Sequence, residues 1–284
     1  MRLRPRGSLC RICGPREHRR LPQPRNIREE SALCFRQRKG SEMHDHSRLL
    51  ENKLERRDVI TDCERQALRS VLTHVVLKPA GSDIVSQDAL VDHSSLVVDG
   101  FCARYRDLSD GRRQYTQINL PGDFIDLHGF VLKRVDHGVR ALSDCLIAEA
   151  PHDRLRKLTE EHPHLTRLLW LETVVDAAMH REWLLALGRQ EALERTALLV
   201  CEIYARLEAV GLARDGAFRF PIIQAEIADL LGMSAVHVNR TLKVMREAGW
   251  LEWTGSEVRI LEWDRLADEA EFNPSYLRLE RLPV

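Results

Sequence analysis

Residues 225–250, AEIADLLGMSAVHVNRTLKVMREAGW, contain two short helical patterns on either side of a Gly-Met pair. In each pattern apolar residues recur every three or four positions, which is the spacing of one buried helix face. Ile227 and Leu231 fall on such a face, and Ala228 is small enough for a second helix to cross closely. The stretch therefore predicts two short helices joined by a tight corner.

The corner itself carries the signals that such a turn requires. Gly232 ends the first helix, because a positive φ is cheap only for glycine. Met233 fills the corner, and the Ser234 hydroxyl can cap the second helix by accepting a backbone N–H. The apolar face of the second helix is formed by Val238, Leu242 and Met245. A helix-turn-helix is the favoured interpretation, and a plain helical hairpin is the alternative.

The other face of the second helix is suited to the major groove of DNA. Arg240 can bind guanine O6 and N7, Asn239 can pair with adenine, and Val236 can contact a thymine methyl group. Expected contacts to the DNA backbone come from Ser234, His237, Lys243 and Arg246. For Lys243 and Arg246 a solvated helix face is an equally good interpretation.

Composition places the chain among globular proteins. Of 284 residues, 44% are hydrophobic and 30% are charged, and no apolar run approaches the roughly 20 residues that span a bilayer. We therefore expect a cytoplasmic protein with no membrane partner. The seven cysteines are an odd, scattered set, which is not a secreted disulfide framework.

Residues 1–42 differ from the rest of the chain. They hold twelve Lys and Arg against four Glu, whereas residues 43–284 hold 31 basic and 39 acidic residues. They are rich in Arg and Pro and lack periodicity, which predicts a disordered basic tail. Met43 follows directly and is a candidate start, in which case the tail is not native. Otherwise the tail is an arm that strengthens nonspecific DNA binding.

Residues 43–165 are predicted to form an antiparallel β-roll after a short helical stretch. The β runs are VLTHVVL, SLVVDGFCARY, RQYTQINL and CLIAEA. Asp99-Gly100 and Asp110-Gly111 predict tight hairpins, and Pro121-Gly122-Asp123 predicts another turn. Many short strands with frequent turns favour a small roll or barrel.

A long helix follows, beginning near Asp153 or Thr166 and ending at Leu187, where Gly188 breaks it. Residues 166–188 carry a short heptad seam, interrupted by Glu182: Leu168, Leu171, Val175, Ala178 and Leu185. The seam either packs within its own domain or pairs with a second copy of the chain.

Residues 189–264 are predicted to form the DNA-binding domain. A helix runs from about Gln190 to Ala209, the helix-turn-helix follows, and WLEWTGSEVRILEW reads as two strands around Thr254-Gly255-Ser256. Residues 265–284 form a C-terminal extension.

This order of parts resembles the Crp/Fnr superfamily of bacterial transcription regulators over about residues 48–264. The matching pieces are LSDGRRQYTQINLPGDFIDLHGF, ALERTALLVCEIYARL and QAEIADLLGMSAVHVNRTLKVMREAGWLE. The resemblance implies an α+β fold: a cyclic-nucleotide-binding-like roll, a dimerisation helix and a winged helix-turn-helix. It also implies a homodimer bound to a two-fold symmetric promoter site on double-stranded DNA, with RNA polymerase as a candidate partner.

The effector is unknown, and the sequence departs from relatives that bind cyclic AMP. Those relatives carry Gly-Glu after the GDFI segment and Arg-Ser further on, for the ribose and the cyclic phosphate. Here Asp126-Leu127 and Val135-Asp136 stand in those places, with Arg134 and Arg140 nearby. A carboxylate would repel the phosphate, so we expect no useful binding of cyclic AMP.

An iron–sulfur cluster, which other relatives hold, is not expected either. The superficially suggestive thiols are Cys10, Cys13, Cys34 and Cys102. The spacing from Cys13 to Cys34 is too long for the pattern of the family, and Cys102 and Cys145 alternate within apolar strands as core residues do.

Two further points concern specificity and the rival class of function. Many relatives carry a cytosine-reading Glu where Val236 stands, so we expect an altered base preference there. An enzyme, or a ligand-binding module that does not contact DNA, is the alternative. The twelve histidines come without an HExxH motif, paired CxxC or Gly-rich phosphate loop, so we expect neither a metal nor catalysis.

Overall fold

The computed structural model describes residues 46–284, which fall within one compact unit of the chain. The expectations for residues 1–42 and for a start at Met43 lie outside the described residues. The same holds for the cysteines of the tail, Cys10, Cys13 and Cys34.

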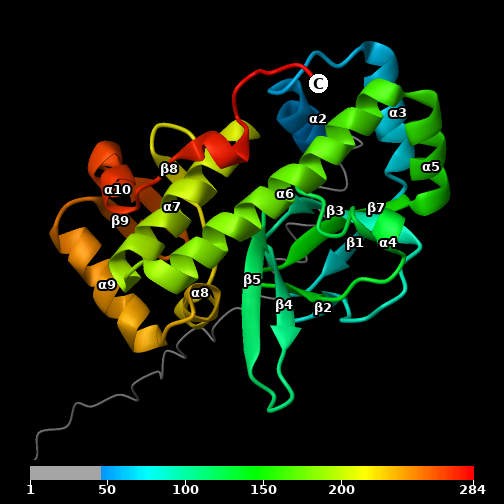
Figure 1. The fold of residues 1–284 in the computed structure, drawn as a ribbon. Helices are drawn as coiled ribbons and strands as arrows, with labels where there is room; N and C mark the ends of the chain where they lie inside the picture. Colours follow the sequence, from blue (N-terminus) through cyan, green and yellow to red (C-terminus); the bar gives the residue numbers. More distant parts are fainter. Residues whose placement is uncertain (1–45) are drawn as a thin grey trace, which may run out of the picture. The chain divides into compact units, whose positions relative to one another are not determined.

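Seven antiparallel strands form the roll, residues 74–151 (Figure 1). The strands are β1 His74–Lys78, β2 Asp83–Val85, β3 His93–Asp99, β4 Cys102–Asp107, β5 Arg113–Asn119, β6 Gly138–Ala141 and β7 Cys145–Pro151. They make two sheets with the orders β1-β7-β3 and β2-β6-β4-β5. The predicted roll is confirmed. Strands β2 and β6 were not predicted, since three or four residues are too few to show an alternating pattern.

One of the two predicted hairpins is present. Strands β4 and β5 pair directly across Asp110-Gly111, as expected. The prediction of a hairpin at Asp99-Gly100 was wrong, because β3 pairs with β7 while β4 belongs to the other sheet. The turn instead carries the chain between the sheets. Gly100 has a φ of +88°, and a Cβ there would lie 2.3 Å from the Asp144 carbonyl oxygen, so only glycine fits.

Helices precede and follow the roll in the sequence. The first two are α2, Arg48–Glu55, and α3, Asp62–Val71, and a short α4, Gly129–Leu132, lies within the roll region. After β7 come α5, His152–Glu161, and α6, Pro163–Arg189. Of the two predicted starts for the long helix, neither is right by itself, because a break at His162 separates α5 from α6.

Helix α6 is the longest element, at 27 residues. It begins at Pro163, which suits the first turn of a helix, where its missing N–H is not needed. The predicted end at Leu187, with a break at Gly188, was two residues too early. Glycine within a helix costs only about 1 kcal/mol, and the chain leaves the helix at Gln190, which is extended.

The remaining elements include the predicted helices and strands in their predicted order, together with a helix and a 3₁₀ turn after them that were not predicted. They are α7 Ala192–Ala209, β8 Ala217–Arg219, α8 Gln224–Leu231, α9 Ala235–Glu247, β9 Leu251–Thr254, β10 Glu257–Ile260, α10 Trp263–Glu269 and a 3₁₀ turn η1 Pro274–Leu277. The two strands expected around Thr254-Gly255-Ser256 are β9 and β10. Strand β8 adds an unpredicted third member, giving the order β8-β10-β9.

The C-terminal segment, residues 271–284, folds back along α6 and α7 to α2 (Figure 1). The Leu277 carbonyl accepts a hydrogen bond from Arg57, just after α2. The backbone N–H of Val284 donates to the Asp58 carboxylate at 3.0 Å. Tyr276 packs in a small apolar cluster with Val175 of α6. The segment therefore joins the end of the described chain to its beginning.

One hydrophobic core extends from the roll into the helix-turn-helix region. Tyr115 and Ile118 of β5 belong to the same buried cluster as much of α7, α8 and α9. Phe101 meets Phe220 edge-on, with 5.3 Å between ring centroids. Buried apolar side chains dominate the stability of such a contact. No helix within residues 46–284 is both long and apolar enough to cross a membrane.

Candidate DNA interface and roll pocket

The corner between α8 and α9 has the local chemistry expected of it. Gly232 adopts a φ of +61° at the C-terminus of α8, and its backbone N–H donates to the Ala228 carbonyl. Met233 donates to the same carbonyl at 3.0 Å and packs against the core. The Ser234 hydroxyl accepts from the N–H of His237 and so caps α9. These contacts fix the crossing of the two helices.

The two helices bury their predicted faces. The buried residues include the predicted Ile227, Ala228 and Leu231 of α8 and Val238, Leu242 and Met245 of α9. Because Val238 and Met245 are fully covered, the opposite side of α9 is turned to solvent. That outer face carries the residues predicted to meet DNA: Val236, His237, Asn239, Arg240, Lys243 and Arg246. Val236 is 73% exposed, so its methyl groups are available to a partner.

Two of the exposed residues have a defined partner. The Asn239 side-chain amide donates to the Gln224 amide oxygen at 3.0 Å. Lys243 lies 3.6 Å from Glu247, one helical turn further on. Gln224 is the first residue of α8 and was not predicted as part of the interface. Its position beside the outer face of α9 follows from the way in which α8 and α9 cross, which the sequence does not show.

Comparison with known proteins agrees with both halves of this architecture. A model for a Crp-like helix-turn-helix domain matches residues 182–269, and one for a cyclic nucleotide-binding domain matches residues 76–162. A probable transcriptional activator of Rhizobium leguminosarum bv. viciae is 31% identical over 170 residues, which cover 60% of this chain and 70% of the relative.

The chain belongs to the Crp/Fnr family. The transcriptional activator FnrL of Cereibacter sphaeroides is 28% identical over 213 residues, covering 74% of this chain and 85% of FnrL. The structure of FixK2 from Bradyrhizobium japonicum matches with a TM-score of 0.61 and 26% identity, over 69% of this chain and 96% of FixK2. The chain is accordingly a DNA-binding transcription regulator of the Crp/Fnr type. Residues 225–250 are therefore a helix-turn-helix and not a plain helical hairpin.

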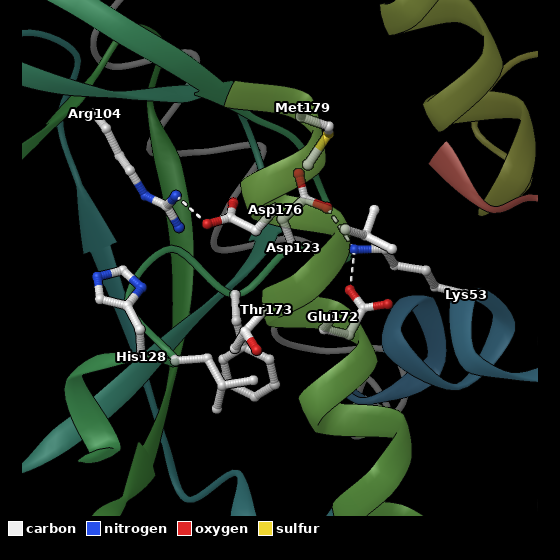
Figure 2. Close-up of a pocket in the computed structure, with 11 residues that line it drawn as sticks. Lys53, Arg104, Asp123, His128, Glu172, Thr173, Asp176 and Met179 are labelled. Carbon is white, nitrogen blue, oxygen red and sulfur yellow. Dashed lines mark hydrogen bonds and ion pairs between the residues drawn. The ribbon is translucent and has the colours of Figure 1, made fainter. Parts of the chain in front are cut away.

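The roll of this Crp/Fnr protein meets α6 across a small pocket (Figure 2). Two carboxylates on α6, Glu172 and Asp176, lie one helical turn apart and line it. Each binds a cation from outside α6. Lys53 of α2 binds Glu172 and also Asp123, the latter at 2.8 Å, and Arg104 of β4 binds Asp176 at 2.6 Å. The cavity that remains measures about 20 Å³, room for about one water molecule.

Arg104 is the most tightly held of these groups. Its side chain is almost completely buried, and the residue is only 2% exposed. Besides Asp176, it donates to the Ile125 carbonyl at 2.8 Å and to the Gln117 side chain at 2.7 Å. Sequence reasoning missed Arg104. The available signal was that Arg104 lies between two apolar residues, Ala103 and Tyr105, in the CARYRD strand.

Asp123, in the predicted Pro121-Gly122-Asp123 turn, connects the pocket to α7. Burial opposes its ionisation, but Lys53 and Arg206 outweigh burial and hold the pKa of Asp123 below its usual value. Arg206 also donates to Glu202 at 2.8 Å. Glu202 is fully buried and accepts two further bonds, from Trp183 of α6 at 3.1 Å and from the Tyr276 hydroxyl at 2.8 Å. A line of buried polar groups thus runs from the roll to the C-terminal segment.

The residues that stand in the nucleotide-binding positions of relatives point elsewhere. Asp126 is fully buried beneath Ser95, which donates to it from its backbone N–H and its hydroxyl. Burial raises the pKa of Asp126 to about 6, against the effect of those two bonds. Asp136 is exposed and pairs with Arg106 at 3.3 Å. The Asp136 carboxylate, which was expected to repel a cyclic phosphate, therefore lies outside the pocket lining. Leu127 is the member of the Asp126-Leu127 pair that lines the pocket.

The two nearby arginines do not enter the pocket either. Arg134 donates to the Asp88 carbonyl at 2.6 Å, and Arg140 lies 3.5 Å from Asp83. Cys102 and Cys145 are both fully buried in the roll core, as predicted. Burial raises the pKa of the Cys102 thiol well above its usual range. Within residues 46–284 no group of three or more His, Cys, Asp and Glu residues is placed to hold a metal ion.

The predicted dimer seam on α6 divides among three environments. Leu168 is completely buried in the core of the roll. Val175 is buried with Tyr276 of the C-terminal segment, and Leu171 and Ala178 are partly buried in the same cluster. Leu185 is 55% exposed. A different set of positions is exposed along the whole helix, and we call it the outer stripe: Arg167, Trp170, Val174, Ala177, Arg181 and Leu184.

Proposed function

We propose that this Crp/Fnr regulator acts as a homodimer on a two-fold symmetric DNA site in the cytoplasm. The observation that carries the proposal is the outer face of α9, where Val236, Asn239 and Arg240 are exposed opposite a buried face. These three residues offer a methyl contact to thymine, an amide for adenine and a forked donor for guanine. We assign phosphate contacts to four residues: Ser234, His237, Lys243 and Arg246.

The outer stripe is our candidate for the dimer contact. Its members recur at alternating spacings of three and four, which is the repeat of a coiled-coil seam. Trp170 is 69% exposed and Leu184 is 73% exposed, and pairing with a second α6 would remove both from water. This assignment rotates the seam by one residue from the sequence-based prediction, because Leu168 and Val175 are already covered within the protomer.

The dimer would set the spacing of the two α9 helices. They must lie about 34 Å apart to enter successive major grooves on one side of DNA. Helix α6 carries the outer stripe and is followed at once by α7, which packs against α9. A shift of α6 against the roll would therefore move the reading helices.

We propose that this movement does not depend on cyclic AMP. The pocket under α6 is occupied by the chain's own pairs, Arg104 with Asp176 and Lys53 with Glu172. A cyclic nucleotide would have to displace these pairs, and Asp126 is engaged with Ser95. Titration calorimetry of the protein with cyclic AMP is expected to show no saturable binding at micromolar concentrations. Saturable binding would refute this part of the proposal.

The comparisons also bear on the mode of action. The relatives are transcriptional activators, so we propose that the chain acts through DNA binding rather than enzymatic turnover. For the same reason RNA polymerase is our candidate partner at the promoter. The proposed working units are the roll domain, residues 43–165, the dimer helix, residues 166–188, and the DNA-binding domain, residues 189–264.

Selection from a random pool of duplexes tests the main proposal. Full-length protein, purified without added ligand, is mixed with the pool, and bound DNA is sequenced. We expect a palindrome with half-sites about one helical turn apart. The Arg240→Ala variant provides the control, and it should lose the preference for a guanine at one position in each half-site. A non-palindromic motif would contradict the dimer, and folded protein that selects no motif would contradict ligand-free DNA reading.

A further inference from the structure

The side chains of Gln224 and Asn239 form a hydrogen bond across the helix-turn-helix. Gln224 is the first residue of α8, and Asn239 lies on the outer face of α9. Their amides meet at 3.0 Å, with the Asn239 nitrogen donating and the Gln224 oxygen accepting. Both residues are exposed, so the bond lies on the surface that we assign to DNA. It is the contact through which α8 reaches the proposed base-reading residues.

The chemistry of an asparagine amide gives this contact a consequence. An asparagine has two N–H donors on one end of its amide and an acceptor oxygen on the other. Reading adenine takes the oxygen, which accepts from N6, and one N–H, which donates to N7. The bond to Gln224 takes one N–H of Asn239 and leaves the oxygen and the second N–H without a partner in this bond. As long as the Gln224 amide keeps this orientation, the bond also disfavours the flipped Asn239 amide, in which two oxygens would face each other.

We propose that Gln224 is a positioning residue that sets the base preference of Asn239. The acceptor on Gln224 holds the Asn239 amide in the orientation that reads adenine, before DNA arrives. Preorganisation of this kind raises selectivity because the amide has less freedom to lose on binding. The proposal rests on the assignment of Asn239 as a base-reading residue. It adds a specificity determinant on α8, a helix to which no base-reading role was assigned.

Gln224 can also contact DNA through its own nitrogen. The Gln224 side-chain oxygen already accepts a hydrogen bond from Asn239. The side-chain nitrogen makes no hydrogen bond within the described residues. The residue stands in the first turn of α8, where the backbone N–H groups of Gln224 and Ala225 precede the first intrahelical bond, made by Ile227. A phosphate oxygen beside this turn would accept from the Gln224 nitrogen. Gln224 would then connect the DNA backbone to the base-reading amide.

Two opposite substitutions at Gln224 test the role of its acceptor. Gln224→Lys replaces the acceptor with a donor, which pairs with the oxygen of Asn239 and takes away the group that reads adenine N6. The added positive charge should meanwhile strengthen binding to all DNA. Gln224→Glu keeps an acceptor and adds negative charge. It should weaken binding to all sequences while preserving the preference for adenine.

The experiment begins with the selected DNA site and the Asn239→Ala variant. The base pair at which this variant loses a preference for adenine is the Asn239 position. Affinities are then measured for adenine and for the other three bases at that position, by fluorescence anisotropy. For the wild type and Gln224→Glu we expect a preference of roughly 5- to 150-fold, the range of a good bidentate contact. For Gln224→Lys we expect the preference to fall at least to a fifth while overall affinity rises.

A combined variant and an altered base separate positioning from a general structural role. Gln224→Lys with Asn239→Ala should show no loss of preference beyond that of Asn239→Ala alone. Replacing the adenine with 7-deazaadenine should weaken the wild type but leave Gln224→Lys unchanged. If Gln224→Lys retains the adenine preference, or if Asn239→Ala alters no base preference, the inference is wrong. The proposed function would survive either result provided that the palindrome and its dependence on Arg240 persist.

Discussion

The outer face of α9 and the pocket beneath α6 treat their charged groups in opposite ways. On α9, Arg240 is exposed, with no ion pair recorded for it within residues 46–284. In the pocket, Arg104 is buried and bound to three acceptors, one of them the Asp176 carboxylate. Leaving a donor unpaired is inexpensive in water, but it costs several kcal/mol in a buried site.

The difference indicates which of the two regions is available to bind another molecule. The α9 face holds its donors ready for a ligand that must bring many acceptors, which is what DNA does. The pocket already supplies a partner for each of its cations, Lys53 and Arg104, from within the chain. An incoming ligand would have to break those pairs before it could gain anything. We therefore expect the two regions to respond very differently to the same kinds of substitution.

The largest expected effect lies in the outer stripe, on the exposed side of α6. Leu184→Glu should convert the dimer to monomer, because it removes two buried leucines from the interface at about 1.5–3 kcal/mol each. Leu185→Glu is the matched control, since Leu185 belongs to the predicted seam but not to the outer stripe. Analytical ultracentrifugation separates the two cases. A monomeric Leu185→Glu together with a dimeric Leu184→Glu would restore the original seam.

The pocket can be broken by removing its best-held cation. Arg104→Ala leaves Asp176 and Gln117 without their partner, and we expect the free energy of unfolding to fall by about 3–5 kcal/mol. Urea denaturation measures the change. Arg106→Ala, two residues along the same strand, removes only an exposed pair with Asp136 and should cost less than about 1 kcal/mol. Equal losses for the two variants would mean that burial does not distinguish these ion pairs.

The buried carboxyl of Asp126 in the roll predicts a pH dependence. The pKa of Asp126 is raised to about 6, above its value of about 3.9 in the unfolded chain. Between pH 4 and 6 the folded state therefore keeps a proton that the unfolded state has lost, and the free energy of unfolding falls as pH rises. Full ionisation of Asp126 would cost the fold about 2–3 kcal/mol by pH 7.

The Asp126→Asn variant tests this dependence because it cannot ionise. Relative to wild type, it should gain about 2–3 kcal/mol in the free energy of unfolding between pH 4 and pH 7. Asp136→Asn, at an exposed carboxylate whose pKa is lowered by its bond to His137, should show no such gain. Urea titrations at both pH values provide the numbers. A constant difference between Asp126→Asn and wild type would show that Asp126 ionises normally in the fold.

The smallest effect is expected on the exposed outer face of α9. Arg240→Ala should remove about 1–3 kcal/mol of discrimination at one base pair while leaving the free energy of unfolding unchanged. Lys243→Ala should instead weaken binding equally for all sequences and reduce the salt slope by about one ion. Affinities at two salt concentrations distinguish the two patterns. Equal loss on every sequence for both variants would make Arg240 a phosphate contact.

The sequence is most informative where structure is decided by close neighbours. Gly232 and Ser234 each act on residues within a few positions, so the corner and both flanking helices could be predicted in detail. The Asp110-Gly111 hairpin was predicted for the same reason. Asp99-Gly100 carries a similar local signal, but its strands pair with distant segments that the signal does not encode.

The seam and the pocket depend on contacts between distant residues. Helix α6 is apolar on more than one side, and only the fold shows that the roll covers Leu168 while Tyr276 covers Val175. Arg104 and Asp176 are 72 residues apart, and nothing in either neighbourhood indicates the other. The partner of Asn239 was missed for a related reason. Gln224 is only 15 residues away, but the contact exists only because of the angle at which α8 and α9 cross.

The C-terminal segment has a consequence for the order in which the chain folds. Its bond from Arg57 to the Leu277 carbonyl spans 220 residues, and its bond from Val284 to Asp58 spans 226. Closing so long a loop costs conformational entropy, which short-range elements such as α8 and α9 do not incur. The hairpins and the helix-turn-helix can form first from local contacts, and the segment then closes over α6 and α7 as a late step. The segment can therefore attach only after α6 and α7, the helices that it covers, have formed.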